Sequence, residues 1–364
     1  VTSKSVSTIA AKNIGLYSIA GLMFCVIGYN VAYGIPEGGY IGSFTPWSDA
    51  SAIETGYSDG SDWWFQMVFC ATTVSIVSGT LAERIKIWPF FLFAAILTGV
   101  IYPIEMGWQW GGGWLSAAGF SDFAGSTLVH AAGGAAALAG AIVLGPRLGR
   151  FSNGKLVPFA SSSIPLATLG TFILWFGWFG FNGGSQLALA GFENATAVAT
   201  IYINTNLAAC AGVMTCAVIT RLINGKTDVI MMLNGALGGL VAITAEPLTP
   251  TPLMAIIIGS IGGIIVILGT QALNKFQIDD VVGAIPVHLF AGIWGTLAVP
   301  LTNSGTSFGP QLLGTASICA FVFVVSFIVW SIMKATIGIR ISEEAEKEGT
   351  DIAETGVTAY AIRD

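Results

Sequence analysis

The chain has 364 residues, of which 54% are hydrophobic and only 9% are charged. Soluble globular domains carry about a quarter charged residues, so this composition excludes a soluble protein and indicates a bilayer as the solvent. The balance of 14 Lys and Arg against 20 Asp and Glu gives a net charge of −6, which leaves no basic surface for nucleic acid. The five cysteines lie in apolar runs without metal-ligand spacing, so we expect no disulfide framework and no metal site.

Apolar runs long enough to cross the hydrocarbon core occur in ten places along the chain. They predict an all-α polytopic membrane protein with spans at residues 12–34, 63–83, 86–106, 124–146, 158–183, 196–221, 229–246, 252–273, 282–301 and 310–336. The transmembrane domain is therefore expected over residues 1–336, followed by a tail at 337–364. The stretch 35–61, rich in Gly, Ser, Asp and Pro, is expected to be irregular.

The charged residues predict how the spans are oriented. All 14 Lys and Arg residues fall before the first span, in every second loop after it, or at the end of the chain. The intervening loops carry only acids, among them Glu37, Asp49, Glu54, Asp59, Asp62 and Glu193. The positive-inside rule then places both visible termini in the cytoplasm of a multi-pass protein of the cell membrane, which agrees with an even number of spans.

An internal repeat contains the only two histidines. The pattern D-x-x-G-x-x-x-V-H occurs at 122–130 and again at 280–288, and each copy has a glycine four residues after the histidine, at Gly134 and Gly292. With ten spans the two copies have opposite orientations, which is typical of transporters built from inverted repeats. The halves are expected at about 1–150 and 158–305, with the last helix at 310–336. The second histidine closes a set of five spans and the first a set of four, so one span is expected to be missing at the N-terminus.

Each histidine lies about two turns inside its span, where an ionisable group needs a cavity or a partner. A single histidine on an apolar helix is commonly a packing residue. Because His130 and His288 occupy equivalent positions of inverted repeats, we expect them to meet in a shared functional site. Asp122 and Asp280 are interpreted as residues that cap helix starts.

Aromatic residues are the other chemical resource of the sequence. They include Trp108, Trp110 and Trp114 before the first repeat, Phe65 and Phe69 one turn apart, and Trp175, Trp178 and Phe181 in the fifth span. Such residues are commonly belt or packing residues. Since we expect no carboxylate deep in the membrane, ring faces are the groups left to attract a small cation, at roughly 0.5–2 kcal/mol per contact.

Several long blocks of this sequence resemble the ammonium transporter/Rh superfamily. They are FQMVFCATTVSIVSGTLAERIK in the second span, WGGGWLSAAGFSDFAGSTLVHAAGG leading into the fourth, WFGWFGFNGGS in the fifth, DDVVGAIPVHLFAGIWG in the ninth, and EEAEKEGTDIAETGVTAY in the tail. The resemblance covers nearly the whole chain. It implies an eleven-helix protomer with a five-plus-five inverted repeat and a narrow central pore, assembled as a homotrimer. The family's first helix is absent from this sequence, in agreement with the repeat count.

The resemblance also implies roles for individual residues. They are Trp110, Phe69, Ser185 and Asp122 for ammonium recruitment, Phe69 and Phe181 for a gate, and His130, His288 and Trp178 for the pore. The implied substrate is ammonium or ammonia, the surroundings are membrane lipid, and no cofactor is expected.

The tail has two readings. Residues 339–364 hold seven of the 20 acids and few apolar residues, which is the composition of a solvated, frayed end. The resemblance implies instead that the tail docks a PII-type signalling protein at the cytoplasmic face. Thr355 stands where many bacterial members of the family have a histidine.

We therefore expect ammonium transport and no enzymatic activity. Ammonium and potassium are similar in size and charge, and an apolar pore cannot rehydrate either cation, so only a substrate that gives up its proton crosses cheaply. Ammonium would bind outside, deprotonate at the gate and cross as ammonia. The alternative is an ammonium sensor that signals through the tail. An intramembrane enzyme would need a nucleophile or a metal cluster beside the histidines, and the sequence has neither.

Overall fold

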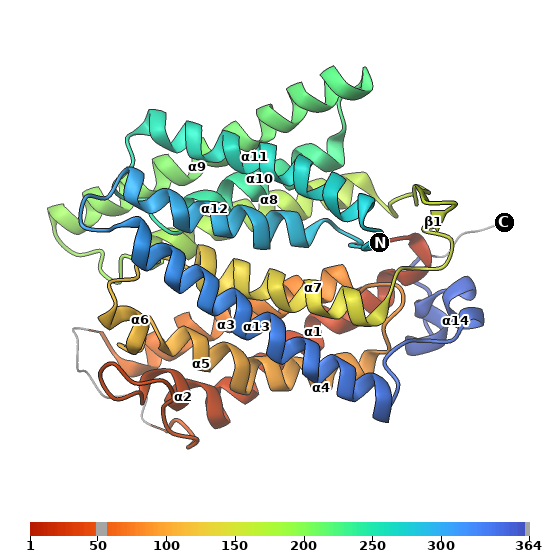
Figure 1. Ribbon diagram of the computed structural model, residues 1–364, viewed down its shortest axis with the longest axis horizontal. Helices are drawn as coiled ribbons and strands as arrows, with labels where there is room; N and C mark the ends of the chain where they lie inside the picture. Colours follow the sequence, from red (N-terminus) through yellow and green to blue (C-terminus); the bar gives the residue numbers. More distant parts are fainter. Residues whose placement is uncertain (49–56, 361–364) are drawn as a thin grey trace.

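The computed structural model describes residues 1–48 and 57–360, and in it the chain folds into long helices packed side by side (Figure 1). Seven helical segments are long and apolar enough to cross a membrane, so the protein has an all-helical polytopic membrane fold. Asp49, Glu54 and Arg363, which contribute to the predicted orientation, lie outside the described residues.

The first part of the chain forms seven α-helices. They are α1 (Val6–Met23), α2 (Tyr29–Tyr33), α3 (Asp59–Thr80), α4 (Ile87–Ile96), α5 (Tyr102–Gly107), α6 (Trp114–Ala117) and α7 (Ala132–Leu144). Wider helical turns join some of them into longer rods, at η2 (Phe24–Gly28), η3 (Leu97–Ile101) and η4 (Ser126–Ala131), and the short turn η1 (Ser3–Ser5) precedes α1. A two-stranded hairpin, β1 (Phe151–Ser152) and β2 (Lys155–Leu156), follows α7.

The second part begins with four long helices and ends in the tail. Its elements are α8 (Ile164–Gly184), α9 (Phe192–Asn224), α10 (Val229–Ile243), α11 (Pro252–Lys275), η5 (Ile285–Phe290), α12 (Ala291–Ala298), η6 (Val299–Leu301), α13 (Phe308–Thr336), α14 (Glu343–Glu348) and η7 (Asp351–Thr355). Each of the ten predicted spans coincides with one of these helices or rods.

Two predicted boundaries need correction, and capping explains both. The fifth span begins at Ile164 rather than at 158, because the Ser163 hydroxyl accepts a hydrogen bond from the Leu166 amide and Pro165 occupies the first turn. The stretch 35–61 is not irregular to its end: α3 begins at Asp59, after the Ser58 side chain accepts from the amide of Ser61.

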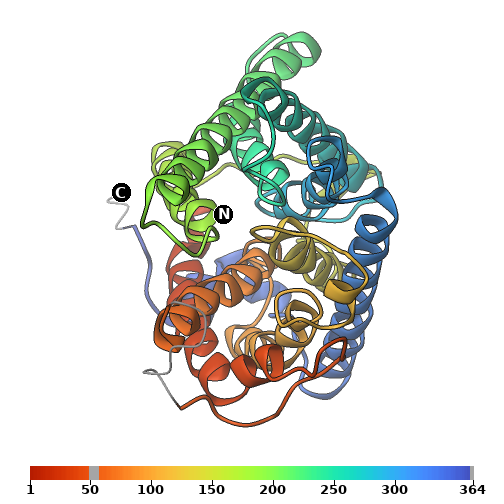
Figure 2. The same ribbon diagram turned by 90° about the vertical axis from the view of Figure 1, so that its left-hand side faces the viewer.

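The two ends of the bundle differ. The N-terminus, the β1–β2 hairpin and α14 gather at one end, which we call the tail end, and α2 and α6 lie at the other, the outer end (Figure 1). Viewed from the outer end, the red and orange helices of the first part of the chain lie on one side of the bundle and the green helices of the second part lie on the other (Figure 2). The chain start and the tail therefore share one end, and their predicted cytoplasmic location stays a prediction.

Close glycine contacts pack α9, α10 and α11 together. A Cβ added at Gly235 would lie 2.5 Å from the carbonyl oxygen of Gly212, and one at Gly263 would lie 2.9 Å from the same atom. Gly239 and Gly259 both pack against the backbone of Ala208. The pairs 235/239 and 259/263 thus bring backbones into contact as their spacing predicts.

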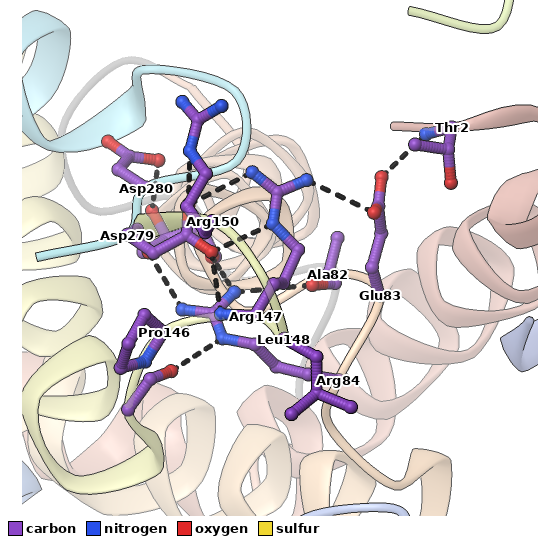
Figure 3. Close-up of polar contacts among 12 residues, drawn as sticks. Thr2, Ala82, Glu83, Arg84, Pro146, Arg147, Leu148, Arg150, Asp279 and Asp280 are labelled. Atoms are coloured by element: carbon purple, nitrogen blue, oxygen red, sulfur yellow. Dashed lines mark hydrogen bonds and ion pairs between the residues drawn. The ribbon is translucent and has the colours of Figure 1, made fainter. Parts of the chain in front are cut away.

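A buried ion-pair cluster ties three loops together at the tail end (Figure 3). The Arg147 guanidinium donates to both carboxylate oxygens of Asp279, at 2.8 and 2.9 Å, and to Glu83 at 3.1 Å. Arg84 donates to the backbone carbonyls of Asp279 and Gly145, each at 2.7 Å. The cluster joins the α3–α4 loop, the α7–β1 loop and the segment before η5.

The pKa values in this cluster follow from burial and from the partners. Burial lowers the pKa of the Arg84 guanidinium to about 10. Burial alone would raise the pKa of Asp279, but the Arg147 hydrogen bonds and the charge of Arg84 hold it below its ordinary value. Asp279 therefore contributes stability above its unfolded pKa of about 3.9, and that contribution is lost as the pH falls through the lower folded pKa.

The tail is packed against the bundle, so the expectation of a solvated, frayed end is wrong for the described part of it. Asp351 accepts from the amides of Val6 and Thr8 at the start of α1, at 3.1 and 2.8 Å. Glu346 pairs with Arg340 at 2.8 Å, and Glu354 accepts from the amide of residue 87 at 2.7 Å. The acidic side chains of the tail thus accept hydrogen bonds from backbone amides at the starts of helices, which would otherwise lack partners.

We predict that Asp279→Asn destabilises the protein. It leaves the Arg147 guanidinium buried without its bidentate partner, and breaking a buried ion pair on one side costs about 3–5 kcal/mol. Thermal unfolding of the purified protein in detergent at neutral pH measures the effect. Glu343→Gln is the control, because its pair with Lys347 is exposed. Equal melting temperatures for the two variants would contradict a structural role for the cluster.

Candidate functional site

The two histidines lie on two turns that are capped in the same way. The Asp122 carboxylate accepts backbone hydrogen bonds of 2.7–3.0 Å from the four residues 125–128, at the start of η4. Asp280 accepts from Gly283 at 3.1 Å and from Ile285 at 2.7 Å, at the start of η5. The predicted capping role of both aspartates is confirmed. Each motif glycine has a positive φ, 102° at Gly125 and 80° at Gly283, which explains the glycine of the motif.

The histidines meet as predicted. The Nδ1 atoms of His130 and His288 are 3.1 Å apart, and the ring centroids are separated by 5.1 Å. A hydrogen bond between two Nδ1 atoms requires that one of them carries the proton and the other accepts it. In such a neutral pair one Nε2 atom is an acceptor and the other is a donor. The Nε2 atom of His130 is buried and has no hydrogen-bond partner among the described residues.

The glycines four residues after each histidine allow the two turns to approach. A Cβ added at Gly134 would lie 2.5 Å from the amide nitrogen of Leu289, the residue after His288. A Cβ at Gly292 would collide with the carbonyl oxygen of Ser126 and lie 3.1 Å from the amide nitrogen of Ala131. Each turn therefore packs on the glycine of the other, and no larger residue fits without moving a backbone.

A column of aromatic rings continues outward from His130. The His130 ring stacks on Trp178 at 5.0 Å and on Phe181 at 5.3 Å. The ring centroids of Phe181 and Phe69 lie 4.1 Å apart, and those of Phe69 and Trp110 lie 5.6 Å apart in an edge-to-face arrangement. The structure thus brings together the residues that the resemblance assigns to recruitment, gate and pore.

Polar contacts fix the positions of several of these side chains. The Trp110 indole donates to the carbonyl oxygen of Asp122 at 2.9 Å. The Ser185 hydroxyl, one turn beyond Phe181 on α8, donates to the carbonyl oxygen of Phe181 at 2.9 Å. The Trp178 indole donates to the Thr244 hydroxyl at 2.8 Å.

A buried polar chain behind Trp178 was not predicted. The Thr244 hydroxyl donates to the side-chain oxygen of Asn182 at 3.2 Å, and the Asn182 amide donates to Thr205 at 2.9 Å. The chain holds the Trp178 ring beside His130. The sequence signal was the polar Asn182 directly after Phe181, whereas the threonines come from other helices and no pattern connects them.

Two cavities flank the contact between Phe69 and Phe181. A cavity of about 280 Å³, the inner cavity, is lined by His130, His288, Trp178 and the α3 residues 72, 75, 76 and 79. A groove of about 470 Å³, the outer groove, is lined by Tyr57 and the α3 residues 61, 62, 64 and 65, together with parts of α8, α9 and the loop between them. Phe69 lies between these two stretches of α3 and is buried. Along α3, the contact between the two phenyl rings therefore lies between the outer groove and the inner cavity.

One buried carboxylate lies near the end of a predicted span. Glu105 is fully buried in α5, within the predicted span 86–106, and neither carboxylate oxygen has a partner among the described residues. It lines neither the inner cavity nor the outer groove. In the described parts of the chain, no three His, Cys, Asp or Glu side chains are grouped so that they could hold a metal ion.

Comparisons with known proteins agree on one family. The family model described as Ammonium Transporter Family matches residues 1–360. The chain is 40% identical over 395 residues to the ammonium transporter Amt2 of Archaeoglobus fulgidus, covering 98% of this chain and 82% of the relative. It is 34% identical over 383 residues to an ammonium transporter of Bacillus subtilis, covering 99% and 92%. A solved structure called Sensor Amt Protein superimposes with a TM-score of 0.92 at 34% identity, covering 97% and 91%.

We predict that Gly134→Ala destabilises the protein by about 1–3 kcal/mol, because the new methyl group must displace the backbone at Leu289. Thermal unfolding in detergent measures this. Gly177→Ala on α8 is the matched control, since a Cβ there meets no atom within 4 Å and alanine favours the helix. If Gly134→Ala unfolded at the same temperature as the control, the close approach of the two turns would not be required.

Proposed function

Because this chain belongs to the ammonium transporter family, we propose that it carries ammonium across the membrane along the path from Trp110 through Phe69 and Phe181 to the histidine pair. It is a transporter and not an enzyme. The observation that carries the proposal is the 3.1 Å contact between the buried His130 imidazole and the half-buried His288 imidazole, at the inner end of an aromatic column.

Recruitment is assigned to the outer side of the gate. The ring centroids of Trp110 and Phe69 lie 5.6 Å apart, with the edge of one ring against the face of the other. Ser185, directly after helix α8, supplies a hydroxyl. Ring faces attract a cation by about 0.5–2 kcal/mol each. Asp122 supports this site from behind, because its carbonyl oxygen fixes the Trp110 indole.

The gate selects by desolvation. The ring centroids of Phe69 and Phe181 lie 4.1 Å apart, and the two rings offer no oxygen to replace the water shell of a cation. Moving a bare cation past them carries the full cost of burying an unpaired charge. Ammonium escapes this cost by leaving its proton on the outer side and passing as ammonia, whereas potassium has no neutral form.

The histidine pair receives the ammonia. The Nε2 atoms of the two imidazoles supply one acceptor and one donor, which match the N–H groups and the lone pair of ammonia. The released proton has two possible fates, return to the outer water or transfer along the imidazole pair. The first moves no net charge and the second moves one charge per molecule, so a current measurement separates them.

Assembly and orientation are carried over as proposals. We propose a homotrimer in the cell membrane, with both visible termini and the tail end of the bundle in the cytoplasm, and with an inverted five-plus-five repeat. A PII-type protein is the proposed partner of the tail. Since Glu346, Asp351 and Glu354 already bind the bundle, such a partner would recognise the docked tail together with the adjoining loops.

We predict that His130→Ala and His288→Ala each reduce transport steeply. Each change leaves the other imidazole without its partner in an apolar pore, at a cost of about 1–3 kcal/mol. The double variant should be hardly worse than either single one, because the first change already breaks the pair. Initial rates of ammonium uptake by proteoliposomes, with potassium as the competing cation, measure both rate and selectivity.

A carboxylate at the same place is a sharper probe. His130→Glu supplies an anionic ligand in the middle of the path, so we expect potassium leakage to appear. If both alanine variants moved ammonium at the rate and selectivity of the unmodified protein, the histidine pair would be a packing contact only.

We predict that Trp110→Leu weakens the preference for ammonium at the outer side while the protein stays folded. Removing one cation–π face of about 1–2 kcal/mol corresponds to a roughly five- to thirtyfold loss of affinity. Uptake at low ammonium concentration, with and without potassium, is the measurement. Trp88→Leu is the control, because Trp88 is exposed on α4 and lines neither the inner cavity nor the outer groove. If both variants distinguished ammonium from potassium equally well, Trp110 would be a residue of the aromatic belt and would have no role in recruitment.

A sensor is the second candidate function, favoured by the close superposition on the structure called Sensor Amt Protein. A sensor would bind ammonium at the same residues and change the docked tail instead of supporting flux. Ammonium-triggered current or pH change in proteoliposomes decides between the two. Flux supports the transporter, and ammonium binding without flux supports the sensor.

A further inference from the structure

The outer groove contains one buried carboxylate that has no cationic partner. Asp62 lies on α3 and is 8% exposed, and its side chain lines the groove. It accepts a hydrogen bond of 2.9 Å from the Tyr29 hydroxyl, which is a neutral donor. Among the described residues it forms no salt bridge.

The sequence offers no nearby cation to complete the pair. Residues 13–83 and 156–220 contain no Lys or Arg, and these two segments supply every residue of the groove. A buried carboxylate without a counter-ion is costly. An incoming cation is therefore the natural partner of Asp62.

The walls of the groove suit a small cation. Four aromatic side chains line it, from Tyr57, Trp64, Phe65 and Tyr202, and the rings of Tyr202 and Phe65 pack closely against Gly183 and Gly184. Aromatic faces and one carboxylate together attract a monovalent cation without binding it as tightly as a cage of several carboxylates would.

The groove leads to the gate. Asp62, Phe65 and Phe69 follow one another at spacings of three and four residues, so they share one face of α3. Phe65 meets Phe69 edge-on at 4.7 Å. With a rise of about 1.5 Å per residue, Asp62 lies about 10 Å outward from Phe69 along the helix.

A packed aromatic cluster holds the carboxylate in place. Tyr29, whose hydroxyl donates to Asp62, has its ring centroid 4.9 Å from that of Tyr33 and 5.8 Å from that of Trp47. Trp47 in turn stacks on Trp63 at 5.1 Å. The orientation of Asp62 is therefore set before any cation arrives.

We propose that Asp62 forms an outer staging site for ammonium, upstream of Trp110, Phe69 and Ser185, which raises the local concentration of the cation in the groove. The proposal rests on the transport function proposed above and adds a residue to it. Because a carboxylate attracts potassium as well, Asp62 governs capture, and selection is left to the apolar gate.

The test compares Asp62→Asn with Asp62→Glu and Asp59→Asn in proteoliposomes. Asparagine keeps an acceptor for Tyr29 and removes the charge, glutamate keeps the charge, and Asp59 is an acid of the same helix that does not line the groove. For Asp62→Asn we expect a KM for ammonium raised about three- to tenfold at low ionic strength, with kcat and the ammonium-over-potassium ratio unchanged. The difference should shrink at high salt, whereas Asp62→Glu and Asp59→Asn should stay close to the unmodified protein.

Two results would overturn the staging site. One is an unchanged KM in Asp62→Asn. The other is an equal rise in Asp59→Asn, which would assign the effect to the general surface charge. Calorimetric titration of the purified protein with ammonium chloride gives a readout that needs no flux. If the unmodified protein showed no flux but Asp62→Asn bound ammonium more weakly, the transport function would be rejected and the staging site kept. If flux were present and Asp62→Asn bound ammonium as tightly as the unmodified protein, only the staging site would be rejected.

Discussion

The architecture depends on one hydrogen bond, between two imidazoles inside an apolar bundle. For the Nδ1 atoms of His130 and His288 to lie 3.1 Å apart, the backbones of two helical turns must almost touch. The repeated motif supplies what this requires. The aspartate satisfies the exposed amides of the turn, the first glycine adopts the positive φ that the turn needs, and the glycine after the histidine leaves room for the other turn.

The charged cluster at the tail end and the histidine pair are mechanically connected. Asp279 is held by Arg147 and Arg84, and the next residue, Asp280, caps the turn that carries His288. Asp280 also accepts from the Thr80 hydroxyl at the end of α3, the helix that carries Phe69. The position of the second imidazole is therefore fixed from the tail end, by residues that do not line the inner cavity.

The sequence was sufficient for those parts of the structure that repeat or that follow one helix. Hydropathy located ten helices or helical rods, and the matching surroundings of the two histidines predicted their contact. Contacts between distant segments with no shared pattern could not be read in this way. The chain from Thr205 through Asn182 to Thr244, the docking of Asp351 on the start of α1 and the burial of Glu105 all depend on side-chain packing that composition does not encode.

Along α3 the chemistry changes in three steps. The first turns carry Asp62 and an aromatic groove, the middle carries the occluding ring of Phe69, and the last turns line a cavity with small and polar residues such as Thr72 and Ser75. Attraction of a cation and rejection of a bare cation are opposite demands, and no single site can meet both. Placing them about two helical turns apart allows each to be strong, because the carboxylate lies outside the desolvated segment and the apolar gate has no charge to compensate.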